Sequence, residues 1–324
     1  MRIRMAGQWA LTGIGLACLA LFWSQTAQAQ VKLQHKFPEG KTFKNKTTSK
    51  THQILTLMGQ EIETRQNATV ITSRTVGKRR GDSTVPVEEK VESLRIELSI
   101  PGGINVTYDS SEPNAKIDNP DVAFLGEVFK LAGESIYTVV LDDQNKVKAI
   151  EGAEKLLEKA DKLSPPARDA IRSRLESDKL RTEFEQQLRR LPDVLARPGE
   201  SWDRTEVVDI GSGQTLTFQK KYEYVGTEKN GDKTLDKISS KTTKVELKQD
   251  GAAESPLKLK KSDLKVESSN ETILFDREEG HVKSATAKIR IKGDDMTFSV
   301  NGTDLAGSLD LTIETNTELL PVAK

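Results

Sequence analysis

The chain has 324 residues, with 49 Lys and Arg against 49 Asp and Glu, and it is 35% hydrophobic and 5% aromatic. Zero net charge argues against an electrostatic nucleic-acid binder, which needs a basic face to neutralise phosphates. One cysteine and three histidines exclude a disulfide scaffold and leave little material for a cysteine- or histidine-based metal or iron–sulfur centre.

Residues 1–29 have the pattern of a secretory signal peptide. Arg2 and Arg4 supply a basic start, an apolar stretch runs from Trp9 to Trp23, and Ala27-Gln28-Ala29 matches a cleavage signal. A membrane span is the competing interpretation, but this stretch is shorter than the roughly 20 residues that a spanning helix needs. We therefore expect an exported protein, periplasmic or extracellular.

The chain that remains after cleavage, residues 30–324, contains no cysteine. It loses Arg2 and Arg4 and no acids, so 49 − 2 = 47 basic residues face 49 acidic ones. No later hydrophobic run approaches spanning length, and we expect no transmembrane span. A lipid-modified Cys18 is an alternative that the residues around it disfavour.

Residues 30–150 are predicted to form a β-rich part with one helix. Every second residue is apolar in one half-buried strand, at Leu94, Ile96, Leu98 and Ile100. Asn119 and Pro120 are expected to begin a helix that ends at Gly133. A hairpin follows, with its turn at residues 142–145.

Residues 151–190 are predicted to be helical. A short helix is expected over residues 152–163, and one long charged helix after Pro165-Pro166 that runs to about Arg190. Its apolar residues form a narrow stripe, which is typical of a helix lying on one surface: Ile171, Leu175, Phe184 and Leu188.

Residues 191–324 return to the strand pattern. Ala285, Ala287, Ile289 and Ile291 alternate with polar residues, and turns are expected at residues 292–295 and 301–302. Consecutive strands joined by short turns predict an antiparallel sheet with one wetted face.

A weak internal repeat relates the two β-rich parts. Gly40-Lys41-Thr42-Phe43 opens the first part and Gly199-Glu200-Ser201-Trp202 opens the second, and an acid-centred hairpin follows later in each. We therefore predict an α+β fold, mostly antiparallel β, with long curved sheets in two related parts and a helical segment between them.

No catalytic constellation is visible in the sequence. His35, His52 and His281 are scattered, no G-x-S-x-G or phosphate-loop motif occurs, and the acid pairs at residues 142–143 and 294–295 lack the alternating ligands of a calcium loop. We predict a protein that is not an enzyme, with no catalytic residue, no metal site and no cofactor.

Several segments of the chain resemble a family of exported bacterial proteins of unknown function. They are Leu191-Pro192, residues 198–202 with a Gly-x-x-Trp junction, and residues 222–228. The resemblance implies a signal peptide and a central helical stretch, and it supplies no catalytic residue. The expected architecture is also remotely similar to the half-barrel of periplasmic lipoprotein carriers, although fold does not determine function.

The favoured function is a non-catalytic module that binds a lipid or another apolar ligand in a curved sheet. The candidate residues of its concave face are Leu94, Ile96, Leu98, Ile289 and Ile291. Small inward residues such as Ala285 and Ala287 would leave room for the ligand. A structural or interaction protein of the cell envelope, with an envelope protein as its partner, is the alternative, and an exported hydrolase is less favoured. Ligand, partner and oligomeric state stay open.

Overall fold

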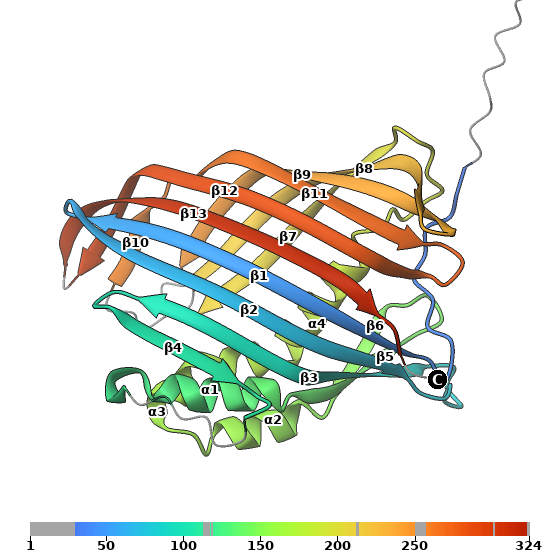
Figure 1. Ribbon diagram of the computed structural model, residues 1–324, viewed down its shortest axis with the longest axis horizontal. Helices are drawn as coiled ribbons and strands as arrows, with labels where there is room; N and C mark the ends of the chain where they lie inside the picture. Colours follow the sequence, from blue (N-terminus) through green and yellow to red (C-terminus); the bar gives the residue numbers. More distant parts are fainter. Residues whose placement is uncertain are drawn as a thin grey trace, which may run out of the picture.

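One antiparallel sheet organises the protein. The computed structural model describes residues 30–112, 117, 119–211, 214–249, 257–300 and 302–322, and thirteen strands within them join into a single long curved sheet (Figure 1). The predicted signal peptide, residues 1–29, lies outside the described residues. The predicted fold class, α+β with mostly antiparallel strands, is confirmed.

The strands are long, and several exceed fifteen residues. They are β1 (Thr42–Leu57), β2 (Gln60–Val76), β3 (Val85–Ile100), β4 (Ile104–Asp109), β5 (Ile136–Leu141), β6 (Val147–Glu151), β7 (Ser201–Gly211), β8 (Gln214–Asn230), β9 (Lys233–Gln249), β10 (Leu257–Lys261), β11 (Lys265–Asp276), β12 (His281–Val300) and β13 (Thr303–Leu320).

The strand order contains a duplication. Across the sheet it runs β6-β5-β3-β2-β1-β13-β12-β11-β9-β8-β7, so the N-terminal order 6-5-3-2-1 is repeated as 12-11-9-8-7, with β13 between the two units. The segments that begin the two repeated units also form matching hydrogen bonds. Gly40 N donates to Val76 O at 2.8 Å, and Gly199 N donates to Tyr224 O at 2.8 Å. This arrangement agrees with the predicted internal repeat.

The helices flank the β5–β6 hairpin in the chain, with η1 and α1 before it and the others after it. They are the 3-10 turn η1 (Pro120–Val122), α1 (Phe124–Gly133), α2 (Ala153–Ala160), α3 (Pro165–Ile171), the 3-10 turn η2 (Arg172–Leu175) and α4 (Ser177–Leu188). Asn119 caps η1 as expected, because its side chain accepts from Asp121 N at 3.0 Å.

The single long helix predicted after Pro165-Pro166 is wrong. Glu176 adopts extended backbone, with φ −64° and ψ 137°, and separates η2 from α4. The apolar stripe therefore divides between elements. Ile171 and Leu175 pack with α1 and α2, whereas Phe184 packs against the sheet at β1, β2, β3, β5 and β6.

The turn predicted at residues 292–295 is also wrong. Strand β12 runs through these residues without a reversal, and a register shift between Gly293 and Met296 absorbs the extra residues as a bulge. Asp294 and Asp295 are exposed there, which explains why a polar Gly-Asp-Asp segment resembles a turn in sequence.

Helix α4 lies between the two edges of the curled sheet. Phe184 is buried in the cluster that includes Phe43, Val87 and Leu141. On the β7 edge, Gln186 Nε2 donates to Val207 O at 3.0 Å and Val207 N donates to Gln186 Oε1. In Figure 1, α4 and strands β7 to β9 pass behind β1 and β13, so the helix faces the concave side of the sheet.

Candidate functional site

The predicted concave-face residues all lie on the same face of the sheet, because the register connects Leu98 with Ile289 across it. Leu94 and Ile96 are buried beneath Phe129 of α1, with Leu98 beside them. Ile291 is fully buried and Ile289 packs beside it, in a separate cluster with strands β8 and β13. The structure therefore divides the five candidates into two groups, and each group contributes to a packed cluster.

A row of small side chains connects these regions across the sheet. From Ile96 on β3 the register runs through Ala68, Ser49, Thr315 and Ala287 to Glu271 on β11. We call the four small residues Ala68, Ser49, Thr315 and Ala287 the concave strip. All four residues are half-buried. Ala68 packs against the cluster of Leu94 and Ile96, whereas Thr315 and Ala287 also line a depression on the opposite face.

A cluster of charged side chains lies at the β11 end of the concave strip. Lys220 Nζ on β8 lies 3.0 Å from Glu206 Oε2 and 3.1 Å from Glu271 Oε2. Arg190, just after α4, lies 3.5 Å from Glu206 and 3.8 Å from Glu271. Tyr222 donates its hydroxyl hydrogen to Glu206 at 2.6 Å. We call these five residues the charged cluster.

The charged cluster is electrostatically balanced. Burial alone would raise the pKa of Glu206, but the charges of Arg190 and Lys220 outweigh burial and hold this pKa below its ordinary value. Burial, together with the neighbouring carboxylates, raises the pKa of Tyr222, which stays a neutral donor. Two cations thus face two anions, and no charge is left over within the cluster.

Two buried polar atoms beside the charged cluster lack hydrogen-bond partners among the described residues. They are Ser240 Oγ and Trp202 Nε1. Ser240 is 3% exposed and lies opposite Tyr222 on one side and Glu271 on the other, while Trp202 lies opposite Tyr222 and stacks on it. Buried polar atoms are rarely left unpaired, so these two mark a place where an external partner fits.

His35 is a further side chain whose ring is buried. Its ring packs edge-on against Phe275 at 5.6 Å. Burial first, and then the charges of Arg74, His281 and Arg190, lower its pKa to about 3, so the imidazole is neutral at physiological pH. His35 also lines a surface groove of about 1120 Å³ between residues 32–35, the β5–β6 turn and residues 185–195.

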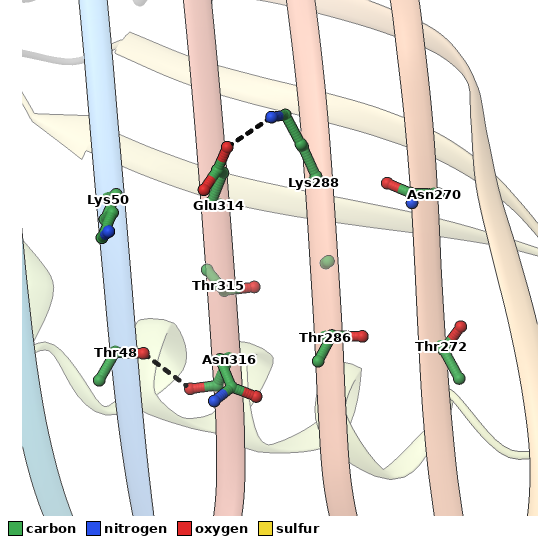
Figure 2. Close-up of a pocket in the computed structure, with 10 residues that line it drawn as sticks. Thr48, Lys50, Asn270, Thr272, Thr286, Lys288, Glu314, Thr315 and Asn316 are labelled. Atoms are coloured by element: carbon green, nitrogen blue, oxygen red, sulfur yellow. Dashed lines mark hydrogen bonds and ion pairs between the residues drawn. The ribbon is translucent and has the colours of Figure 1, made fainter.

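The opposite, convex face carries a polar depression of about 460 Å³ (Figure 2). Thr48 donates its hydroxyl hydrogen to Asn316 O at 3.5 Å, and Lys288 pairs with Glu314 at 2.6 Å. Eight of its ten lining residues form two cross-strand rows on the side away from the helices, and the other two, Thr315 and Ala287, belong to the concave strip. The rows are Thr48, Asn316, Thr286 and Thr272, and Lys50, Glu314, Lys288 and Asn270.

The charged cluster was missed in the sequence, although a signal for it exists. Lys220 lies between Phe218 and Tyr222 in strand β8, so its side chain falls on the same face as theirs. Glu271 precedes the buried Ile273 by two residues in the same way. A charge at an inward position of a strand predicts an internal ion pair.

Within the described residues, no three His, Cys, Asp or Glu side chains gather closely enough to hold a metal ion. The described helices also include none that is both long and apolar enough to cross a membrane.

A family model described as a family of unknown function, DUF6263, matches residues 82–318. This agrees with the resemblance to a family of unknown function, while the Leu-Pro…Gly-x-x-Trp junction and the likeness to lipoprotein carriers stay predictions. The comparison with curated proteins found no match.

Among solved structures, the chain is similar to lipovitellin, described for its lipid–protein interactions, with a TM-score of 0.43 and 10% identity over 89% of this chain and 26% of that one. This chain thus spans about a quarter of the lipovitellin chain. An outer membrane channel from Pseudomonas putida F1 matches with a TM-score of 0.22 and 8% identity, over 89% of this chain and 98% of that one. A DUF1329 family protein from Desulfovibrio piger matches with a TM-score of 0.13 and 6% identity, over 86% and 87% of the two chains.

Proposed function

The chain belongs to DUF6263, a family of unknown function, and we propose that it is an exported, non-catalytic protein that holds a lipid or another apolar ligand on the concave face of its sheet. The proposal of export rests on the pattern of residues 1–29. The proposal of binding rests on the concave strip.

The half-burial of the concave strip carries this proposal. Protein interiors are packed to nearly crystalline density, and large side chains from neighbouring elements normally cover an inward face. Here the row from Ala68 to Ala287 presents only small side chains on half-buried residues, and Ala68 at one end packs against the apolar cluster of Leu94 and Ile96. Space left beside small inward residues can accommodate a ligand.

The length of the row also suits an acyl chain. Five inter-strand steps separate Ile96 on β3 from Glu271 on β11. At roughly 4.8 Å per step they span about 24 Å along the sheet. The acyl chains of one bilayer leaflet extend over about 15 Å, half of the hydrocarbon thickness.

The pairing in the charged cluster supports a non-catalytic role. A general base must be free to take a proton, and a nucleophilic carboxylate must face its substrate. Glu206 and Glu271 both contact Lys220, at 3.0 and 3.1 Å, and both also face Arg190. These ion pairs occupy the carboxylate oxygens of both residues.

The alternative, an interaction protein of the envelope, has one observation in its favour. Val207, Val208 and Ile210 are 39 to 45% exposed on β7, which lies at an edge of the sheet. Exposed apolar residues on an edge strand can pair with a partner. A ligand-free protein that captures a partner through β7 would favour this alternative.

Mass spectrometry of an organic extract tests the proposed function. The full chain is expressed in an exporting bacterial host, purified without detergent and extracted with chloroform and methanol. We expect stoichiometric lipid from the native protein and strongly reduced lipid from Ala287→Phe, because the added ring fills the concave strip. Thr286→Phe, on the convex face of the same strand, should retain the lipid. A clean native extract, or equal lipid in both variants, would refute the proposal.

A further inference from the structure

The unpaired atoms beside the charged cluster indicate what kind of head group the ligand carries. Trp202 Nε1 can only donate a hydrogen bond, and Ser240 Oγ can donate as well as accept. Both atoms are buried and lack partners among the described residues. The complementary group on a ligand is therefore an acceptor oxygen.

The register places these atoms at the end of the concave strip. Ala287 lies opposite Glu271, Glu271 opposite Ser240, Ser240 opposite Tyr222, and Tyr222 opposite Trp202. A ligand whose tail lies along the strip thus brings its head group to Ser240. This placement of the head group rests on the proposed function, because it requires the apolar tail of the ligand to lie along the concave strip.

Arg190 is the side chain that has to move. It contacts Glu206 on β7 and Glu271 on β11, so its guanidinium lies over the two strands between them. Its side chain is 35% exposed and its Nε has no hydrogen-bond partner among the described residues. A long, partly exposed side chain on the segment after α4 can swing aside and close over a bound head group.

The charge balance of the site selects against an ionised ligand. Arg190 and Lys220 are already neutralised by Glu206 and Glu271, so a carboxylate or phosphate would bring a buried charge without a spare cation. An amine would face the same difficulty with the opposite sign. An ester or amide carbonyl supplies the acceptor without the charge.

We propose that the ligand is a neutral acyl lipid, an acylglycerol-type ester, whose carbonyl or hydroxyl oxygens accept hydrogen bonds from Ser240 and Trp202. The ion pairs of the charged cluster leave no spare cation and so discriminate against free fatty acids.

The fluorescence of Trp202 can report ligand binding. The sequence contains two further tryptophans, Trp9 and Trp23. In the full chain with Trp9→Phe and Trp23→Phe, all tryptophan fluorescence comes from Trp202. The delipidated protein is titrated at pH 7.5 with 1-monodecanoylglycerol, with decanoate and with decylamine, each below its critical micelle concentration.

We expect 1-monodecanoylglycerol to bind at least tenfold more tightly than decanoate or decylamine, because an unpaired charge is costly to bury. Ser240→Ala should weaken 1-monodecanoylglycerol binding roughly fivefold, the equivalent of one hydrogen bond. Ser239→Ala, on the convex side of the same strand, should leave the affinity unchanged.

The outcomes separate the two proposals. Equal or tighter binding of decanoate, or an affinity that Ser240→Ala does not change, would overturn the assignment of a neutral head group while the binding function stands. Binding of none of the three ligands, together with a lipid-free extract of the native protein, would overturn the proposed function itself.

Discussion

Replacing Lys220 by methionine should destabilise the protein strongly at neutral pH. Lys220 is 14% exposed and lies 3.0 and 3.1 Å from two carboxylates, Glu206 and Glu271, that are 11% and 6% exposed. The variant leaves both carboxylates to Arg190 alone, at 3.5 and 3.8 Å. Removing one partner from a buried ion pair typically costs about 3–5 kcal/mol in the free energy of unfolding. Urea denaturation followed by circular dichroism measures this loss.

Acidification should restore part of the unfolding free energy that Lys220→Met loses. The pKa of Glu206 is depressed in the native protein, so its contribution to stability is present above its ordinary value of 4.5 and is lost as the pH falls through the folded pKa. Without Lys220 the pKa of Glu206 in the folded protein rises, so acidification protonates this carboxylate and removes the unfavourable charge. Lys221→Met, on the exposed face of the same strand, should have a free energy of unfolding within about 0.5 kcal/mol of that of the native protein. A loss that is equal in both variants, or one that does not shrink on acidification, would refute this reasoning.

Three further perturbations test other parts of the fold. Gly280→Ala should release the N-terminal segment to limited proteolysis, since φ is +74° and a Cβ would lie 2.3 Å from Lys36 Cγ. The pKa of His35 is about 3, so lowering the pH from 7.5 to 5.5 should cost about 1.4 kcal/mol of unfolding free energy as the unfolded imidazole takes up a proton, and His35→Gln should remove that dependence in urea titrations. Gln186→Ala frees the edge at Val207, and should cost about 1 kcal/mol and increase light scattering on concentration.

Each of these variants has a matched control. Gly302→Ala has φ +84° but open space around the new Cβ, so it should leave the proteolysis pattern native. His52→Gln removes an exposed histidine that pairs with Glu63 at 2.6 Å, and its comparison with His35→Gln isolates the effect of the buried ring. Gln187→Ala leaves β7 covered and should not scatter light. Identical behaviour of a variant and its control would contradict the contact that the variant tests.

Local patterns predicted most elements because local chemistry determines them. Asn119 and Pro120 give η1 its cap, and the acid-centred turn at residue 142 closes the hairpin through bonds from Gln144 N and Lys146 N to the Asp142 carboxylate, both 2.9 Å. The prediction of one long helix is wrong because the helix is interrupted at Glu176. Leu175, before the break, packs with α1 and α2, and Phe184, after it, packs on the sheet. One straight helix cannot serve both surfaces.

The candidate site was harder to predict because its members are distant in sequence. Arg190, Glu206, Lys220 and Glu271 meet only after four strands have paired in register, and charge patterning along a chain does not specify register. The apolar candidates were easier, since alternation assigns Leu94 and Ile291 to an inward face. Whether such a residue lines free space or a filled core depends on the helices that cover it.

The central place of β13 has a consequence for how the polypeptide is assembled. Residues 307–320 pair with residues 44–57, so the strand that unites the two repeated units is synthesised after all the other strands of the described sheet. Until it arrives, β1 and β12 both present unpaired backbone over long stretches. Pairing between such distant segments is slow, and the open edges are prone to aggregate in the meantime. We expect the nascent chain to depend on a chaperone that holds it until β13 is inserted.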